Sequence, residues 1–174
     1  ATVDQAVADP VLRRFIDALM QHEIEPTLPG IDGAGYRPRL LQRFANPALK
    51  HRLLQIAMDG SQKVPQRWLG TVRDRLAAGQ PIDRLALAVA GWLRFVHGHD
   101  EAGRALPLDD PQAAALRAAV AAPGGGLGHE PVFGDLVAHA AFRAAVQRQG
   151  DLLCSQGVRG ALQACLSQPG TGRG

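Results

Sequence analysis

A chain of 174 residues is long enough for one domain with a buried core, or for two small domains at most. Hydrophobic residues make up 46% of it and charged residues 20%, which is ordinary for a globular protein. The net charge of +3 is too small, by itself, to indicate a nucleic-acid-binding protein. The first residues lack a basic region followed by an apolar run, so we predict no signal peptide and expect a cytoplasmic protein.

Capping signals near the start of the chain predict short, consecutive helices. The candidate caps are Thr2 with Gln5, which have the spacing of a capping box, and Asp9 followed by Pro10. The second helix should end near Glu25. Residues 27–35 are rich in glycine and proline and predict an irregular loop, and a further helix is expected over 38–45.

A helix is predicted over residues 46–58. Asn46 is a good N-cap and Pro47 takes the first helical position, where its missing N–H has no intrahelical partner to lose. Apolar side chains at helical spacing predict its core face, and a second set spaced by four predicts a polar stripe. The core set is Leu49, Leu53 and Ile56, and the polar set is His51, Gln55 and Asp59. Gly60 should end the helix.

Lys63 lies on the turn 61–63 that should follow this helix. The C-terminal end of a helix is a negative pole, so a lysine is favoured there. Its ammonium group can point at the hydroxyl or carboxylate oxygens of a small polar ligand, next to Gln55 and Asp59. The alternative is that Lys63 only caps the free carbonyl groups of the helix end.

Two further helices are predicted over 65–78 and 82–97. The second is apolar almost all round, which indicates the buried centre of a helical domain, and it is too short to span a bilayer. Arg94 is the exception within it. As a structural residue it would pair with Asp100 or Glu101; as a functional residue it would form a fork with a substrate carboxylate.

The sequence of the C-terminal part predicts further helices before and after one break. Asp110 with Pro111, and then Asp135, should start helices, and Gly157 and Gly160 can split the last one. The glycine-rich segment 123–131 predicts a flexible break; it lacks the dinucleotide-binding spacing. No convincing strand is present, so the predicted fold is all-α. We expect no metal site, and we expect the two cysteines to be free thiols.

Several of these segments together resemble one known family. Residues 43–67 read RFANPALKHRLLQIAMDGSQKVPQR, and residues 90–103 read AGWLRFVHGHDEAG, with Asp110-Pro111 behind them. With TVDQAVADP near the start, they are similar to the C-terminal domain of the long-chain mannitol dehydrogenase family. Gln55 stands where members that act on neutral polyols tend to carry arginine. The sequence is therefore most similar to the hexuronate branch, which includes fructuronate reductase, also called mannonate oxidoreductase.

The resemblance implies a single helical domain over 1–174, of the 6-phosphogluconate dehydrogenase C-terminal type. It implies a substrate-side role in an oxidoreductase that uses NAD or NADP, bound by an N-terminal Rossmann domain absent from this sequence. The enzyme would interconvert a keto sugar acid, or a keto sugar, and the corresponding alcohol. The substrate-binding candidates are Lys63, Gln55, Asp59 and Arg94. Asp59 would orient Lys63.

The resemblance also implies that this chain lacks the catalytic residues. The family's Lys-x4-Asn-x2-His motif does not occur here, because Lys50 and Lys63 are the only lysines and Asn46 is the only asparagine. We therefore expect no dehydrogenase activity from the chain alone. Two alternatives stay open: a stand-alone module that binds a sugar acid without catalysis, and a helical interaction or nucleic-acid-binding protein, for which the arginines at 37–43 are the best but a weak candidate.

Overall fold

The computed structural model describes residues 1–168, and within them the chain forms helices and no β-strand. The α-helices are α1 (Val3–Ala8), α2 (Pro10–Leu19), α3 (Gly33–Phe44), α4 (Leu53–Ala57), α5 (Gly60–Val64), α6 (Gly70–Ala77), α7 (Asp83–Val96), α8 (Ala113–Ala121), α9 (Glu130–Phe133) and α10 (Ala140–Ser167). Between them lie π-helical segments at Met20–Ile24 and Pro65–Leu69, and 3-10 segments at Glu25–Thr27, Pro47–Leu49 and Gly134–Ala138. The prediction of an all-α fold is confirmed.

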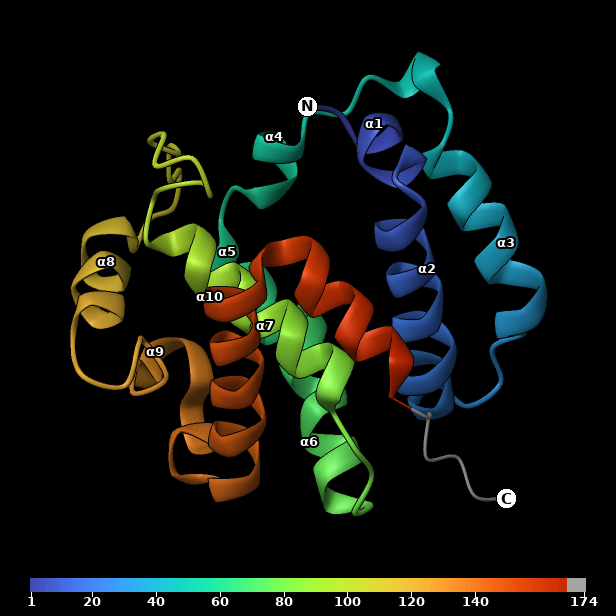
Figure 1. Ribbon diagram of the computed structural model, residues 1–174. Helices are drawn as coiled ribbons and strands as arrows, with labels where there is room; N and C mark the ends of the chain where they lie inside the picture. The colour runs from blue at the N-terminus through green and yellow to red at the C-terminus, as the bar shows by residue number, and fades with distance from the viewer. Residues whose placement is uncertain (169–174) are drawn as a thin grey trace.

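Helix α7 lies at the centre of the molecule, as predicted from its all-round apolar pattern. The long helix α10 packs along it, with α2 and α8 also in contact with it (Figure 1). Leu85, Val89 and Val96 are fully buried in this core. Trp92 packs edge-on against Phe133, with ring centroids 6.3 Å apart. Among the described residues, no helix is long and apolar enough to cross a membrane.

The N-terminal caps are present as predicted, but the next helix starts earlier than expected. The Asp9 carboxylate accepts hydrogen bonds from the backbone of Val11 and Leu12, and α1 begins with the predicted capping box. Helix α3 begins at Gly33 and not near Pro38. The Asp32 carboxylate accepts from the backbone N–H of Gly35, and this cap starts a helix within a segment whose composition predicted a loop.

The start of α7 is capped from another part of the chain. Glu23, on the π-helical segment after α2, is only 1% exposed. Its carboxylate accepts hydrogen bonds from the backbone N–H groups of Arg84 at 2.9 Å and Leu85 at 2.8 Å. The Arg84 guanidinium lies 3.5 Å away. Burial raises the pKa of Glu23, since its desolvation outweighs these favourable contacts.

The glycine-rich segment after α8 joins the same core. Successive turns are closed by backbone hydrogen bonds from Gly125 to Ala122 and from Leu127 to Gly124. Leu127 is buried within the central hydrophobic cluster. The segment therefore does not divide the described residues into two units, and its flexibility stays a prediction.

Two aspartates predicted to start helices have tertiary partners. Asp110 binds Ser61 across the fold, and Asp135 pairs with Arg73. Helix α10 instead begins after His139, whose ring nitrogen accepts from the Phe142 backbone. It bends at Gly157, as predicted. Cys154 and Cys165 are free thiols on either side of the bend; burial raises the pKa of the Cys165 thiol to about 11.

Candidate functional site

The helix predicted over 46–58 is interrupted in the structure. Pro47–Leu49 forms a single 3-10 turn, Lys50 takes a left-handed conformation (φ 46°), and α4 begins only at Leu53. The reason is the start of the chain. The backbone N–H of Val3 donates to the His51 carbonyl, and the N–H of Leu53 donates to the Ala1 carbonyl, so extended pairing replaces one helical turn.

The interruption overturns both predicted faces of that helix. Leu49, Leu53 and Ile56, expected in the core, are exposed. The polar stripe does not form either, because His51 precedes α4 and Asp59 follows it. Gln55 is exposed on α4.

The residues after α4 form a tightly held turn. Asp59 adopts a left-handed conformation (φ 56°), and Gly60 then begins α5, so Gly60 starts a helix where it was predicted to end one. The Asp59 N–H donates to the Asp109 carbonyl at 3.0 Å. The backbone N–H and the hydroxyl of Ser61 donate to the two Asp110 oxygens at 2.8 and 2.6 Å.

Glycine is required at the start of α5 because the chain runs against the central helix. A Cβ atom at Gly60 would collide with the indole of Trp92 on α7. Ser61 and Val64, on the same short helix, are buried. With that face turned inward, α5 is fixed between α7 and the Asp109–Asp110 segment, and the backbone that carries Lys63 is fixed with it.

Lys63 is half-buried, and its side chain reaches back to α4. The ammonium nitrogen donates to the Ile56 carbonyl at 3.2 Å, which is the capping interaction considered from the sequence. Asp59 contacts Lys63 through its carbonyl oxygen, which accepts from the Lys63 backbone N–H at 2.9 Å. Its carboxylate makes no hydrogen bond within the described residues. The structure thus brings Gln55, Asp59 and Lys63 together around the end of α4.

Arg94 lies elsewhere in the fold. It follows Trp92 by two residues, which is about 200° around a helix, so it leaves α7 on the side away from α5. Its guanidinium donates to the Leu153 carbonyl on α10 at 2.9 Å and lies 4.0 Å from the Glu101 carboxylate. Glu101 in turn accepts from the Val158 N–H at 2.7 Å.

These contacts place Arg94 at the bend of α10. Leu153 lies in the last turn before Gly157, and Val158 begins the helix again after it. Arg94 therefore satisfies a carbonyl on one side of the bend, while Glu101 satisfies an N–H on the other side. For Arg94, the sequence predicted pairing with Asp100 or Glu101 as the structural role, and the pairing with Glu101 is present. Asp100 pairs with Arg104 instead.

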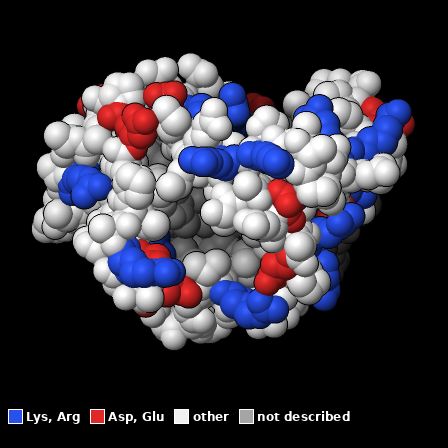
Figure 2. All heavy atoms as spheres, turned by 90° about the horizontal axis from the view of Figure 1, so that it is seen from above, with Lys and Arg blue, Asp and Glu red and all other residues white. Residues whose placement is uncertain are grey.

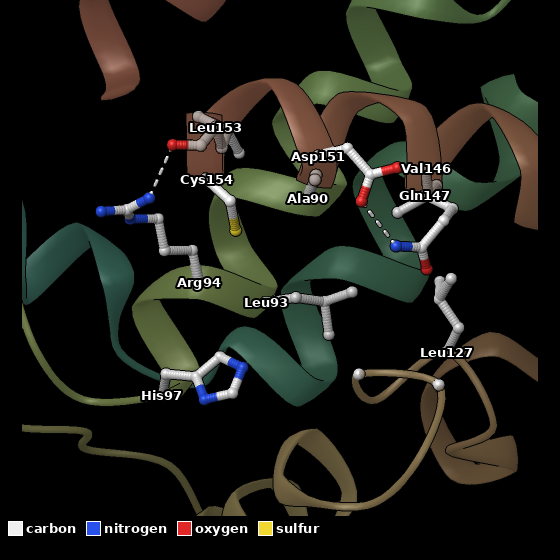
Figure 3. Close-up of a pocket in the computed structure, with 13 residues that line it drawn as sticks. Ala90, Leu93, Arg94, His97, Leu127, Val146, Gln147, Asp151, Leu153 and Cys154 are labelled. Carbon is white, nitrogen blue, oxygen red and sulfur yellow. Dashed lines mark hydrogen bonds between the residues drawn. The ribbon is translucent and has the colours of Figure 1, made fainter. Parts of the chain in front are cut away.

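Arg94 also borders a cavity of about 180 Å³ between α7, α10 and the glycine-rich turns (Figure 3). Its lining includes the apolar Leu93 and Leu127, with Asp151 and Cys154 on α10 and His97 just after α7. Arg94 also lines a second hollow, together with Glu101 and Arg104. Lys63 lines neither of the two, so a carboxylate bound by Arg94 would lie apart from Lys63. The four predicted substrate-binding residues thus divide into a group of three and a separate arginine.

Asp110 is the residue of this site that the sequence analysis missed. Asp110-Pro111 was interpreted as a helix start, and the Asp110 carboxylate does accept from the Gln112 backbone N–H at 2.8 Å, just before α8. The same carboxylate also holds the Ser61 turn, which was not predicted. A signal was present, since both segments belong to the family resemblance, but the contact between residues so far apart in the chain appears only in the folded structure.

Removal of the Ser61 hydroxyl should loosen this turn. Ser61→Ala leaves a buried carboxylate with one partner fewer, and we expect the free energy of unfolding to fall by about 1.5–3 kcal/mol, as for hydrogen bonds to charged groups. Urea denaturation measures it. Ser155→Ala is the control, because that exposed hydroxyl bonds only to carbonyls of its own helix. Equal losses in both variants would contradict the assigned role of Ser61.

Among the described residues, neither a metal-binding cluster nor the dinucleotide-binding unit of a Rossmann domain is found. They hold no group of three or more His, Cys, Asp or Glu side chains able to bind a metal ion. Without a strand among residues 1–168, they also lack the strand–turn–helix unit that binds a dinucleotide.

Comparisons with known proteins agree with this picture. Residues 1–153 match the family model of the mannitol dehydrogenase C-terminal domain. D-mannonate oxidoreductase of Escherichia coli is 42% identical over 168 residues, covering 91% of this chain and 35% of the relative. A mannitol 2-dehydrogenase of Phaeosphaeria nodorum is 40% identical over 137 residues, covering 76% of this chain and 24% of the relative.

A solved structure is also similar. Pseudomonas fluorescens mannitol 2-dehydrogenase, in a ternary complex with NAD and D-mannitol, superposes with a TM-score of 0.90 at 30% identity, covering 97% of this chain and 36% of that one. The chain thus spans about a third or less of the length of these relatives.

Proposed function

The chain belongs to the mannitol dehydrogenase family, whose C-terminal domain it matches, and from this premise we propose that it is the substrate-side domain of a nicotinamide-dependent oxidoreductase. The reaction interconverts a keto sugar acid, or a keto sugar, with its alcohol. The observation that carries the proposal is the turn at Asp59–Lys63, which Asp109 and Asp110 fix. This turn brings the Lys63 ammonium to the carbonyl of Ile56, the residue that follows Gln55.

Lys63 is the central binding group of the proposal. An ammonium group has three donors, and the bond to the Ile56 carbonyl uses one of them. Two remain for hydroxyl or carboxylate oxygens of a substrate. Gln55, exposed on α4, helps to select among substrates, and Asp59 positions Lys63 through its backbone carbonyl. Such contacts hold the reacting carbon in the orientation that hydride transfer requires.

Cofactor and proton transfer are assigned to another part of the enzyme. NAD or NADP, held by an N-terminal Rossmann domain, supplies or accepts the hydride. The Lys-x4-Asn-x2-His motif of the family, which this sequence lacks, supplies the general acid or base. The partner of this domain is therefore the cofactor domain, and the two free thiols favour a reducing, cytoplasmic location.

A keto sugar acid is the preferred substrate of the proposal. The 42% identity to D-mannonate oxidoreductase and the glutamine at position 55 support it. The test is steady-state kinetics on a polypeptide in which this chain follows a cofactor domain, with fructuronate and fructose as substrates. We expect kcat/KM to be at least tenfold higher for fructuronate. The reverse preference would overturn the acid assignment, and turnover of neither substrate would overturn the function.

The stand-alone binding alternative has its own test. Titration of the isolated chain with mannonate, without cofactor, is expected to give no binding tighter than millimolar, since one face of the substrate lacks its partner groups. Micromolar binding would favour the stand-alone module instead.

The carboxylate role of Arg94 is tested by Arg94→Met, which keeps the stem and removes the guanidinium. The position at the α10 bend predicts a loss of stability of about 1–3 kcal/mol with unchanged KM. A carboxylate role instead predicts a KM that rises at least tenfold for fructuronate and not for fructose. Glu101→Gln is the matched control, because it removes the negative charge that pairs with Arg94 at the same bend and leaves the guanidinium itself in place.

A further inference from the structure

Arg84, at the start of α7, is a buried charge with unused hydrogen-bonding capacity. It is 7% exposed, and its Nε has no hydrogen-bond partner among the described residues. Its guanidinium lies 3.5 Å from Glu23, but the two oxygens of that carboxylate already accept backbone N–H groups at the start of α7. A guanidinium has five N–H donors, so Arg84 can bind further acceptors.

A second buried guanidinium adds to the positive charge. Arg75 on α6 is 5% exposed and donates to the Pro81 carbonyl at 2.7 Å. Burial lowers the pKa of Arg75 most, attraction to Glu23 raises it, and repulsion from Arg84 lowers it further. One buried carboxylate thus faces two buried guanidinium groups, which leaves an excess of one positive charge. A buried charge without a counter-ion is costly.

The acidic groups nearby do not balance this excess. Asp83 pairs with Arg148 at 3.4 Å, and Asp17 pairs with Arg37 at 2.6 Å. Burial raises the pKa of the Cys165 thiol to about 11, so this group is neutral at physiological pH. The excess buried charge therefore calls for a counter-ion from outside the chain.

Arg84 lines a hollow of about 440 Å³, which we call the Arg84 hollow. It lies between the second half of α2, the π-helical segment after α2, the start of α7 and the end of α10. Its volume falls within the range of small-molecule pockets, about 300–1,000 Å³. Beside Arg84, the polar lining consists of two basic side chains, three neutral ones and one acid: Arg14, His22, Gln21, Ser167, Gln168 and Asp17.

The Arg84 hollow is separate from the turn that carries Lys63. In Figure 1 the ends of α2 and α10 lie together in the lower part of the molecule, whereas the N-terminus and α4 lie at the top. Figure 2 shows the upper face, where basic and acidic side chains are interspersed. The Arg84 hollow therefore differs from that face both in place and in its balance of charge.

We propose that the Arg84 hollow binds a phosphate group, with the Arg84 guanidinium as its central donor and the exposed Arg14 as a second one. A guanidinium fork matches two phosphate oxygens. Two guanidinium groups and the His22 imidazole around one hollow suit a dianion better than a single carboxylate. The group is either inorganic phosphate or the phosphate monoester of a small metabolite. Neither the substrate nor the cofactor of the proposed function enters this assignment.

The test is isothermal titration calorimetry of the 174-residue chain with inorganic phosphate and with glycerol 3-phosphate, at an ionic strength held constant with potassium chloride. We expect one of them to bind with a Kd below about 1 mM. At ten times its Kd, that ligand should raise the melting temperature by about 3–6 °C. Tighter binding of inorganic phosphate supports a free-anion site, and tighter binding of glycerol 3-phosphate supports a metabolite site. A Kd above 1 mM for both overturns the proposal.

Two adjacent arginines on α2 provide a matched pair of variants. Arg14→Glu should weaken binding about tenfold or more, because it places a negative charge in the lining. Arg13→Glu makes the same change of net charge at an exposed position outside the lining, and it should weaken binding less than about threefold. Equal weakening by both would mean a general effect of surface charge and would overturn the proposal.

The central donor and the end of the chain are tested in the same way. Arg84→Gln should abolish binding, with circular dichroism to show that the helices remain; if this buried change unfolds the chain, the Arg14 and Arg13 variants decide. Residues 169–174 follow Gln168, which lines the hollow, so a chain shortened after Gln168 is also titrated. Binding to the shortened chain alone would overturn the proposal for the full chain, because residues 169–174 would then compete with the anion.

Discussion

Replacement of Lys63 by alanine is expected to lower kcat/KM about 100-fold in an enzyme in which this chain follows its cofactor domain. The variant loses two charge-assisted hydrogen bonds to substrate, each worth about 1.5 kcal/mol or more, and about 1.4 kcal/mol corresponds to a factor of ten in rate. Steady-state kinetics with fructuronate measures the effect. Circular dichroism should show unchanged helix content, because the lost intramolecular bond is a single contact to the Ile56 carbonyl.

Two further variants separate charge from position at this site. Lys63→Arg keeps the positive charge but replaces a compact ammonium by a planar fork, so it should recover only part of the activity. Gln62→Ala changes the exposed neighbour on the same short helix and should leave kcat/KM within about twofold. Unchanged kinetics in Lys63→Ala would show that its only role is to cap α4.

The largest effect on stability is expected at Glu23. Glu23→Ala removes the acceptor of two backbone N–H groups at the start of α7. It also leaves the buried Arg84 charge without its partner at 3.5 Å. Loss of one member of a buried ion pair costs about 3–5 kcal/mol, and urea denaturation measures it. Asp17→Ala is the control, since Asp17 pairs with Arg37 at a partly exposed position and Glu25 remains as a second partner; its loss should stay below about 1 kcal/mol.

Glu23 also predicts the sign of a pH effect. Its folded pKa is raised above the ordinary value of 4.5 by burial. A raised acid pKa means that the folded state disfavours the ionised form, so the contribution of this carboxyl is full below pH 4.5 and is lost as the pH rises through the folded pKa. Glu23→Gln cannot titrate. The difference in unfolding free energy, wild type minus Glu23→Gln, should therefore fall as the pH rises from 4 to 7, and a rising difference would contradict the raised pKa.

The sequence by itself determined the class of fold and its centre. Local signals act through neighbouring residues, so the capping box at Thr2, the Asp9-Pro10 start and the bend at Gly157 could all be predicted correctly. The buried helix α7 could be predicted too, because apolar residues lie on all of its faces, so that no face favours contact with water. The family and the group of Lys63 candidates followed from the resemblance over 43–67 and 90–103.

Where contacts between distant segments compete with local sequence signals, only the tertiary structure decided the outcome. The pattern over 46–58 favours one continuous helix. In the structure, backbone groups of Ala1 and Val3 form hydrogen bonds with Leu53 and His51, and these bonds divide the helix. Asp110 and Glu23 bind groups far away in the sequence, and these contacts replace or add to local capping. Arg94 was grouped with Lys63 because both could bind substrate oxygens. On α7, however, Arg94 lies two residues after Trp92, and this offset turns it toward α10. Contacts between distant segments carry no local signal, and they decide the geometry of this site.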